Sequence, residues 1–345
     1  MFKKMVAILS HIFVMAMSCS QSGVEPQPAN GYHVVKDLEW AQPDGHSLTM
    51  DIYTPQTGKT IYPVILIFHG GGWLINTNAV MDSMSIYLVQ HAEYVVCNIN
   101  YRLLGDQNNS VTMNQIVEDA MGAVLWVKAH ITAYQGDPNR IIVTGDSAGG
   151  HLAAMVVLAG HRLESDGFDG ESFGFNPSCL PAGKNAEQVA QENGLSVQAA
   201  VFSYAAFDLY ASCLGGFETA ANFFWAFAGK PPRGIFGNDF NVQKDAARYQ
   251  AVSPLYAISK SSERPLPPML CAVGSRDNLV TPASVQQFVR RLEENGHVAV
   301  YWEHQGRPHA YLDSAKNDLL GTEFRQDAVP ALDRMIEFLD AIFYR

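Results

Sequence analysis

Three short runs of almost uniformly apolar residues are the feature that most limits the fold of this chain. They are PVILIF at 63–68, YVVCNI at 94–99 and IIVT at 141–144. Runs of this length without polar alternation predict strands that are covered on both faces, which is typical of parallel sheets. Helical periodicity occupies the intervening segments, most clearly at 113–130. Strands that alternate with helices predict an α/β domain whose mostly parallel central sheet is flanked by helices.

The same patterns continue toward the C-terminus. Further strands are predicted at 47–53, 197–204, 268–273 and 298–302, and further helices at 148–160, 281–295 and 326–343. Two long connections interrupt the alternation: 161–195 is polar and Gly-rich, and 208–252 contains an aromatic cluster. Because long connections in a compact domain are usually functional, we expect 208–252 to form a cap over the site. The alternative is an insertion whose aromatic side chains only pack on the domain.

Charge and cysteine content exclude several classes of protein. The chain of 345 residues has 23 Lys and Arg against 34 Asp and Glu, a net charge of −11, and no basic cluster. Nucleic acid is therefore not an expected partner. The five cysteines include no C-x-x-C pair, so neither a disulfide scaffold nor a zinc module is expected. Cys97 and Cys271 fall in predicted central strands and should be buried thiols, and we predict a disulfide between Cys179 and Cys213 of the two insertions.

The N-terminal residues have the pattern of an export signal. Lys3 and Lys4 precede an apolar run at 5–17, which is followed by small residues. A basic start, a short apolar core and small residues after it predict a signal peptide at 1–18. The run is too short for a stop-transfer helix.

Cys19 follows this signal directly, as in bacterial lipoproteins, although Ala16 stands where such signals usually have Leu. We expect lipidation of Cys19, and plain secretion is the alternative. Residues 19–32 then form a tether, and 33–345 form the domain. The expected location is the cell envelope, lipid-anchored or periplasmic or secreted, with membrane contact only through Cys19.

The sequence GDSAGG at 145–150 carries the strongest chemical signal. It follows the predicted strand IIVT and precedes the helical run HLAAMVVLAG, and a G-x-S-x-G pattern at a strand-to-helix turn indicates a nucleophilic serine. Such a turn is sharp, and larger side chains two residues before and after Ser147 would clash. The helix N-terminus also favours a developing negative charge. We interpret His151, four residues after Ser147, as a packing residue or one that supports the site.

The sequence HGGGW at 69–73 ends an earlier strand, where this kind of fold has its oxyanion-hole loop. Glycines let backbone N–H groups approach a tetrahedral oxyanion without obstruction. We assign the N–H groups of Gly71, Gly72 and Ala148 as oxyanion donors. We interpret His69 as a residue that fixes the loop and not as the base.

A serine nucleophile needs a histidine base that is oriented by a carboxylate. Asp277 follows the predicted strand at 268–273, and His309 comes shortly after the next strand. The chain order is therefore Ser, Asp, His, as in α/β-hydrolases. Asp208 and His304 are rival candidates for the acid and the base.

Three segments resemble the hormone-sensitive-lipase-like branch of the α/β-hydrolase superfamily. They are HGGGW at 69–73, NYRL at 100–103 and GDPNRIIVTGDSAGGHLA at 136–153, and the similarity extends over roughly 45–345. The opening SLTMDIYTP at 47–55 is also similar to feruloyl and acetylxylan esterases and to arylformamidases.

This resemblance implies an α/β-hydrolase fold with Ser147 as nucleophile, Asp277 as acid and His309 as base. Two departures bear on substrate choice. Gly105-Asp106-Gln107 stands where the family usually continues with Ala-Pro-Glu, and the insertion at 161–195 is longer than the family pattern.

The expected activity is hydrolysis of short-to-medium acyl esters through an acyl-enzyme, without cofactor or metal. Alternatives are a carbohydrate esterase of acetylxylan or feruloyl type, an arylformamidase-like amidase, and an inactive fold that serves as a binding module. The expected partner is a small-molecule or saccharide ester, and the oligomeric state stays open. We assign substrate contacts to Trp73, Phe223, Phe224 and Trp225, because aromatic side chains beside the serine would form an apolar pocket.

Overall fold

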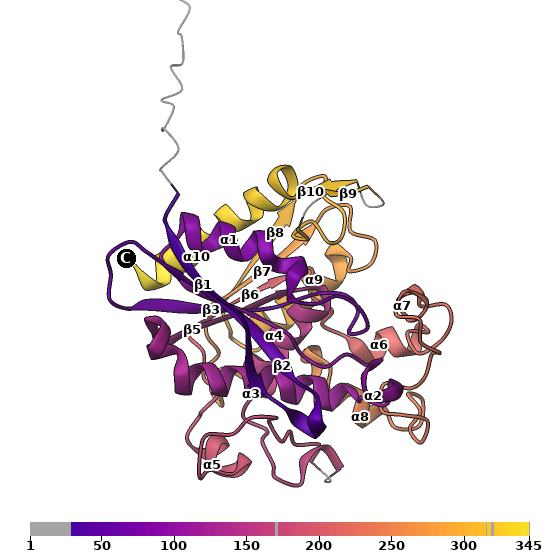
Figure 1. Ribbon diagram of the computed structural model, residues 1–345. Helices are drawn as coiled ribbons and strands as arrows, with labels where there is room; N and C mark the ends of the chain where they lie inside the picture. The colour runs from indigo at the N-terminus through magenta and orange to yellow at the C-terminus, as the bar shows by residue number, and fades with distance from the viewer. Residues whose placement is uncertain (1–28, 170–171, 315, 319–320, 345) are drawn as a thin grey trace, which may run out of the picture.

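A mixed sheet of eight strands forms the centre of the computed structural model, which describes residues 29–345 except 170–171, 315, 319–320 and 345 (Figure 1). The predicted signal peptide at 1–18, Cys19 and most of the predicted tether lie outside the described residues. The strands are β1 (Tyr32–Ala41), β2 (Leu48–Pro55), β3 (Tyr62–Phe68), β4 (Val95–Ile99), β5 (Gly136–Asp146), β6 (Ala199–Ser203), β7 (Met269–Gly274) and β8 (Ala299–His304).

The strand order is β1-β2-β4-β3-β5-β6-β7-β8. The pairs β1–β2 and β2–β4 are antiparallel, and all pairs from β4 to β8 are parallel. Every residue of β3, β4, β6 and β7 is buried, because helices cover both faces of the parallel part. The prediction of a mostly parallel α/β sheet is confirmed.

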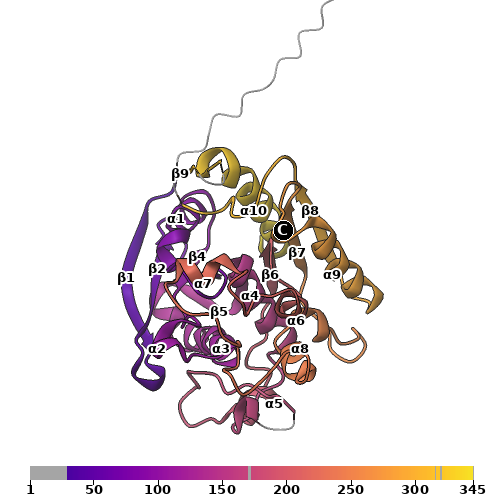
Figure 2. The ribbon, with the colours of Figure 1, turned by 90° about the vertical axis from the view of Figure 1, so that its right-hand side faces the viewer.

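Helices flank the sheet in two layers (Figure 2). They are α1 (Asp82–His91), α2 (Asp106–Asn109), α3 (Met113–His130), α4 (Ser147–Ala159), α5 (Ala186–Gln191), α6 (Leu209–Leu214), α7 (Phe223–Phe227), α8 (Ala246–Ala251), α9 (Pro282–Glu294) and α10 (Val329–Phe343). Helices α1 and α10 pack together on one face of the sheet, and α3 and α4 pack together on the other. A small hairpin of β9 (Lys316–Asn317) and β10 (Thr322–Glu323) and a π-helical turn precede α10. No helix of the described part of the chain is both long and apolar enough to cross a bilayer.

Strand β1 and helix α1 are among the elements that the sequence did not predict. Strand β1 lies at the edge of the sheet with most of its residues partly or fully exposed, so it lacks the apolar run that marks the central strands. Helix α1 buries only Met84, Ser85, Leu88 and Val89 and has little amphipathic pattern. Both elements depend on tertiary contacts more than on local sequence.

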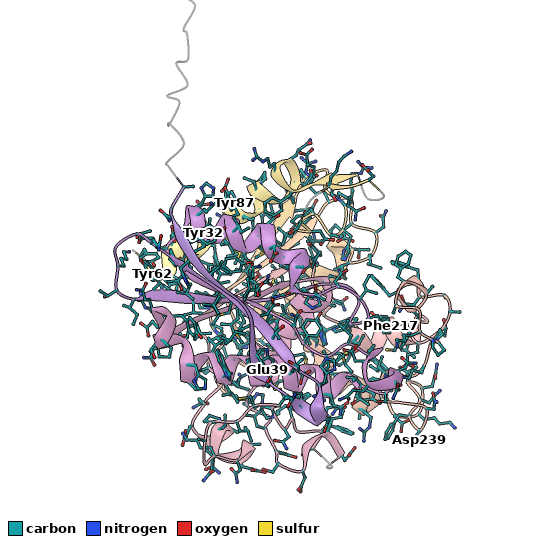
Figure 3. The ribbon with its side chains drawn as sticks, in the orientation of Figure 1. Tyr32, Glu39, Tyr62, Tyr87, Phe217 and Asp239 are labelled. Carbon is teal, nitrogen blue, oxygen red and sulfur yellow. The ribbon has the colours of Figure 1, made fainter. Side chains whose placement is uncertain are left out.

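Residues 208–252, which we call the cap after the prediction for this segment, contain α6, α7 and α8, and these helices lie together at one side of the molecule. In Figure 3, Phe217 of the cap lies on the side of the molecule opposite Tyr32 of β1. The cap is joined to the insertion at 161–195 by Arg248, whose guanidinium lies over four aromatic rings. These rings belong to Phe168, Phe173, Phe236 and Phe240, and the distances from the guanidinium carbon to the ring centroids are 3.9–5.6 Å. Cation–π contacts of a desolvated guanidinium stabilise such a junction.

One of the two cysteine predictions is confirmed and the other is wrong. Cys97 and Cys271 are buried free thiols in β4 and β7, as predicted. The predicted disulfide between Cys179 and Cys213 is wrong, because both are free thiols. Cys179 packs its backbone against Gly122 of α3, whereas Cys213 is buried within the cap on α6, so the two insertions place their thiols against different parts of the domain.

Candidate active site

Ser147 lies at the turn that joins β5 to α4. Its backbone φ is +50°, a left-handed conformation that is uncommon for any residue with a Cβ. Side chains are impossible at the two flanking glycines. A Cβ on Gly149 would lie 1.9 Å from the carbonyl oxygen of Phe68, and one on Gly145 would lie 2.4 Å from the carbonyl carbon of Gly149. The glycines thus allow the turn to pack directly on the end of β3.

Ser147, His309 and Asp277 form a continuous hydrogen-bonded chain. His309 Nε2 lies 2.9 Å from Ser147 Oγ, and His309 Nδ1 lies 2.7 Å from Asp277 Oδ2. The other carboxylate oxygen of Asp277 accepts hydrogen bonds from the backbone N–H groups of Leu279 and Val280, at 2.9 and 2.8 Å. These bonds fix the carboxylate, and the carboxylate orients the imidazole.

The rival residues are engaged elsewhere. Asp208 caps the N-terminus of α6 by accepting a hydrogen bond from Ala211 N at 2.9 Å. His304 Nε2 donates to the carbonyl oxygen of Asp327 at 2.8 Å, and burial lowers the pKa of His304. Neither residue contacts Ser147.

The HGGGW loop leaves β3 beside the serine turn. Gly71 and Gly72 have φ values of +121° and +61°, and a Cβ on Gly71 would lie 2.3 Å from the carbonyl oxygen of Ile75. Within the described residues, the N–H groups of Gly71 and Gly72 have no hydrogen-bond partner. Ala148 is the second residue of α4, where a backbone N–H has no partner within its own helix.

His69 is held inside this loop. It is fully buried, its ring stacks on that of Tyr101 at 4.4 Å, and its Nδ1 lies 2.8 Å from Gly70 O. Burial lowers the pKa of His69 to about 4, so the imidazole is neutral at physiological pH. His69 does not contact Ser147, which fits a role in fixing the loop.

Trp73 and His151 join the loop to α4. The indole N–H of Trp73 donates to His151 Nδ1 at 3.2 Å, and His151 Nε2 donates to the carbonyl oxygen of Val252 at 2.7 Å. His151 is therefore the neutral tautomer with its proton on Nε2, and burial lowers its pKa to about 4.

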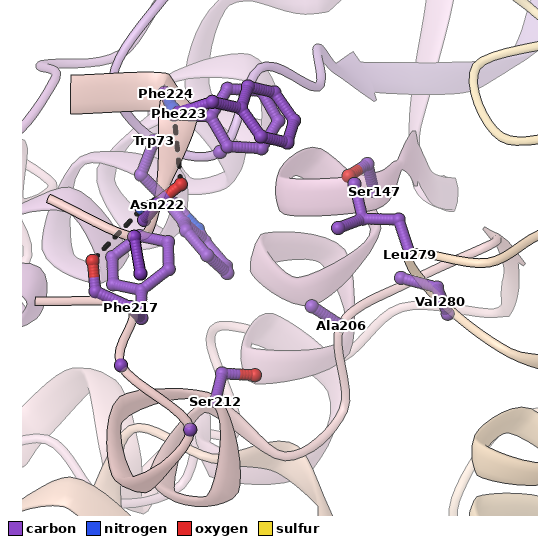
Figure 4. Close-up of a pocket in the computed structure, with 14 residues that line it drawn as sticks. Trp73, Ser147, Ala206, Ser212, Phe217, Asn222, Phe223, Phe224, Leu279 and Val280 are labelled. Atoms are coloured by element: carbon purple, nitrogen blue, oxygen red, sulfur yellow. Dashed lines mark hydrogen bonds between the residues drawn. The ribbon is translucent and has the colours of Figure 1, made fainter. Parts of the chain in front are cut away.

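Two pockets meet at Ser147. We call the first the cap arm. It has a volume of about 260 Å³ and lies between the cap and the loop after β7 (Figure 4). Its lining includes Gly72, Trp73, Ser147, Ala206, Ser212, Phe217, Asn222, Phe223, Phe224, Leu279 and Val280.

We call the second pocket the histidine arm, because His309 lines it and does not line the cap arm. Its volume is about 530 Å³. Its lining includes Gly71, Asn76, Asp146, Ser147, Phe223, Phe224, Phe227, Arg276, Asn278, Leu279, His309, Asp313 and Asn317.

The aromatic residues singled out in the sequence have different positions. Phe223 and Phe224 line both arms, and Trp73 lines the cap arm. Phe224 packs on Gly72, where an added Cβ would lie 2.7 Å from its ring. Trp225 lines neither arm. It is buried in the cap, and its indole N–H donates to Phe217 O at 2.8 Å, so it packs the cap instead of facing the pocket.

Two carboxyl groups that the sequence analysis did not identify lie in the histidine arm. Asp146 is buried and accepts a hydrogen bond from Gly70 N at 2.7 Å. Burial and the nearby Asp313 raise the pKa of Asp146 well above its usual range. Burial raises the pKa of Asp313 to about 6, although His309 acts in the opposite direction. The polar neighbour of a motif serine, Asp146, was visible in the sequence, but no pattern predicts Asp313.

Ser212, Asn222, Ala206 and Val280 were also missed, because they lie on irregular segments whose path a sequence pattern does not specify. Among the residues that the structure describes, no group of three or more His, Cys, Asp or Glu side chains is arranged to hold a metal ion.

A family model named BD-FAE matches residues 50–292, which include the HGGGW loop, the serine turn and Asp277. The chain belongs to the BD-FAE family. His309 lies beyond the matched BD-FAE region, on the loop after β8.

Curated relatives of this BD-FAE chain are named as esterases. A probable isoprenylcysteine alpha-carbonyl methylesterase of Oryza sativa subsp. japonica is 25% identical over 268 residues, which is 76% of this chain and 54% of that protein. The carboxylic ester hydrolase LipN of Mycobacterium tuberculosis is 34% identical over 134 residues, or 38% of this chain and 34% of that protein. The chain thus spans about half or less of the length of these relatives.

The fold agrees with solved structures. The apo form of Thermogutta terrifontis esterase 2 superposes with a TM-score of 0.63 at 22% identity, covering 90% of this chain and 95% of that one. With the strand order described above, this similarity shows that the BD-FAE chain has the α/β-hydrolase fold.

Proposed function

We propose that this protein is a serine carboxylesterase. The observation that carries the proposal is the hydrogen-bonded chain from Ser147 Oγ through His309 to Asp277, at 2.9 and 2.7 Å. The N–H groups of Gly71 and Gly72 lie beside this chain and have no hydrogen-bond partner in the described part of the protein. Together they make the arrangement that acyl transfer requires. The esterase names of the curated relatives support the same activity.

The reaction follows from the geometry. Ser147 Oγ attacks the ester carbonyl while His309 Nε2 takes the hydroxyl proton, and Asp277 stabilises the imidazolium. The N–H groups of Gly71, Gly72 and Ala148 stabilise the oxyanion of the tetrahedral intermediate. His309 then gives its proton to the leaving alkoxide, and water releases the acyl group by the same steps in reverse order.

We assign the acyl and alcohol parts of the substrate to the two arms from the position of His309. The leaving oxygen must lie next to the imidazole that protonates it, so the alcohol part of the ester occupies the histidine arm. The acyl part then extends from Ser147 into the cap arm.

The cap arm suits short acyl groups. Its volume of about 260 Å³ is below the range of about 300–1,000 Å³ that is typical of pockets for drug-sized ligands. Phe217 and Phe224 provide an apolar wall. We propose acetyl to short-chain acyl groups as the best substrates.

A panel of p-nitrophenyl esters from acetate to decanoate tests this proposal. We expect the highest kcat/KM for short chains and none in Ser147→Ala. No turnover of any ester by the folded wild-type protein would favour the alternative of an inactive binding module. Turnover of N-formyl aromatic amines in preference to esters would favour an amidase.

A carbohydrate ester is the second candidate substrate, and one observation favours it. The histidine arm combines polar side chains, among them Asn76 and Asn278, with the exposed rings of Phe223 and Phe227. Polar groups that bind hydroxyls beside rings that stack on a sugar face are suited to a saccharide alcohol. Comparison of acetylated and feruloylated oligosaccharides with simple alkyl esters tests this candidate.

We also propose export with lipidation of Cys19, from the basic residues, apolar run and small residues that precede it in the sequence. In a bacterial host the full chain should fractionate with membranes, and Cys19→Ser should release it or leave it unprocessed. Mass spectrometry of the N-terminal peptide measures the acyl modification directly.

A further inference from the structure

Asp146 lies at the junction of the two loops that form the site. It directly precedes Ser147, and its Oδ1 accepts the hydrogen bond from Gly70 N at 2.7 Å. A Cβ on Gly70 would lie 2.3 Å from Asp146 Oδ2, so the carboxyl group and the glycine backbone are in direct contact. The side chain thus joins the serine turn to the oxyanion loop.

Among the residues that the structure describes, no Lys or Arg side chain forms an ion pair with this buried carboxyl group. Asp146 is 2% exposed, and its carboxyl group contacts the N–H of Gly70 and the hydroxyl of Tyr204. The carboxyl group of Asp313 acts on it electrostatically. Tyr101 and Tyr311 are other titratable groups that lie close to Asp146.

Asp313 supplies the second carboxyl group. It lies four residues after His309 and lines the histidine arm with His309 and Asp146. Arg276 lines the same arm, but its guanidinium forms no ion pair with either carboxyl group among the described residues. Two carboxyl groups that line one pocket and form no ion pair with a cation among the described residues there do not both ionise freely, and the more buried one retains the proton.

We propose that Asp146 and Asp313 form a carboxyl pair that holds one proton at neutral pH. Asp146 is its neutral member and positions the oxyanion loop through Gly70, and Asp313 is its ionised member and faces His309. The pair is separate from the catalytic triad, and both residues are positioning residues. The kinetic consequences rest on the proposed esterase function, whereas the protonation of Asp146 does not.

The pair has two consequences for catalysis. A neutral Asp146 holds the loop without adding a second buried charge beside the triad. An ionised Asp313 stabilises the imidazolium that His309 becomes during the reaction. The pKa of Asp313, raised by burial to about 6, means that this support is lost as the pH falls through that value.

The first test is infrared spectroscopy of the substrate-free protein. The difference spectrum of wild type minus Asp146→Asn should contain the C=O stretch of a protonated carboxyl group at pH 7. In Asp313→Asn this band should disappear at a lower pH on titration, because the charge that favours the protonated form of Asp146 is gone. If the band is absent at pH 7, or if it titrates at the same pH in Asp313→Asn as in wild type, the proposed carboxyl pair is wrong. If Asp146→Asn does not fold, the proposal is tested by comparing the pH titration of the carboxyl band in wild type with that in Asp313→Asn.

The second test is the pH profile of kcat/KM. Asn replaces a neutral carboxylic acid closely, so Asp146→Asn should stay within about threefold of wild type, whereas Asp146→Ala should lose roughly tenfold or more. We call the fall of kcat/KM on the acidic side of the profile, where His309 becomes protonated, the acid limb. Asp313→Asn should move the acid limb to lower pH by about 0.5–1 unit, because removal of a negative charge near the imidazole lowers the pKa of His309. Asp318→Asn, an exposed carboxylate on the same segment, is the matched control and should leave the limb in place.

An unchanged acid limb in Asp313→Asn, or an equal shift in Asp146→Asn, would overturn the assignment of charge within the pair. Lack of esterase activity in the wild type would contradict the proposed function, and the infrared result would still decide the protonation of Asp146.

Discussion

Trp73 Nε1 and His151 Nδ1 lie 3.2 Å apart, in a hydrogen bond that joins the HGGGW loop to the helix of the nucleophile. The other ring nitrogen of His151 donates to Val252 O, at the C-terminal end of the cap. A single buried imidazole therefore connects three segments around Ser147. It performs this function only when neutral, because a protonated Nδ1 cannot accept a hydrogen bond.

His151 should make stability depend on pH. Its pKa is lowered by burial to about 4, below the value of about 6.5 in the unfolded chain, so the unfolded state binds more protons between these values. The stability that the neutral ring contributes is complete above pH 6.5 and is lost as the pH falls toward 4. We expect the free-energy cost of His151→Gln to be about 2 kcal/mol smaller at pH 5 than at pH 7. Urea denaturation at both pH values measures this difference, in which all other titrating groups cancel. His33→Gln, an exposed control, should show no such change.

Ser147→Ala should abolish esterase activity without unfolding the protein. The hydroxyl is small, and Ala occupies the same backbone conformation. We expect a fall in kcat of about 10⁴-fold or more, as for removal of a triad member in other serine hydrolases. Measurement of p-nitrophenyl acetate hydrolysis together with the Tm checks both parts, and substantial residual activity would contradict the role of Ser147.

Asp277→Asn and Asp208→Asn form a matched pair. Asp277 orients His309, so its amide should favour the wrong tautomer and reduce kcat by roughly 10³–10⁴-fold. Asp208 only caps α6, and Asn is an equally good cap. Asp208→Asn should therefore retain activity and stability. A larger loss of kcat in Asp208→Asn than in Asp277→Asn would overturn the choice of acid.

Phe217→Ala and Phe224→Ala should relax acyl selectivity, because both rings line the cap arm. We expect the kcat/KM ratio of octanoate to acetate esters to rise by about tenfold in at least one variant. Phe227→Ala is the control on the same helix as Phe224, since Phe227 lines only the histidine arm. Trp225→Phe should lower the Tm and keep the ratio. If neither Phe217→Ala nor Phe224→Ala changes the ratio, the acyl group does not occupy the cap arm.

The central strands and the long helices were predictable because each satisfies a local rule. The helix predicted at 113–130 coincides with α3, and the runs at 63–68 and 94–99 became β3 and β4. The serine turn was predictable for a different reason. Its two glycines are required by backbone contacts that permit no other residue, so the pattern in the sequence reflects the geometry directly.

Contacts between distant irregular segments were not predictable. Asp313, which follows β8, lines the same pocket as Asp146 at the end of β5, and nothing in the local sequence specifies the path that brings it there. Trp225 and Phe224 are neighbours in an aromatic run, yet one packs the cap and the other lines the pocket. In a helix, adjacent residues point in directions about 100° apart, and composition alone does not reveal which direction faces the serine.

The contact between Gly149 and the carbonyl oxygen of Phe68 has a consequence for folding. Phe68 and Gly145 are paired across β3 and β5, although they stand at positions 68 and 145 of the chain. The oxyanion loop and the serine turn begin at this pair, so neither has its final shape until the two strands have met. Pairing of such distant segments is slow relative to local helix formation. In a refolding experiment, ester hydrolysis would therefore return after helical circular dichroism, and its lag would measure the time at which β3 and β5 join.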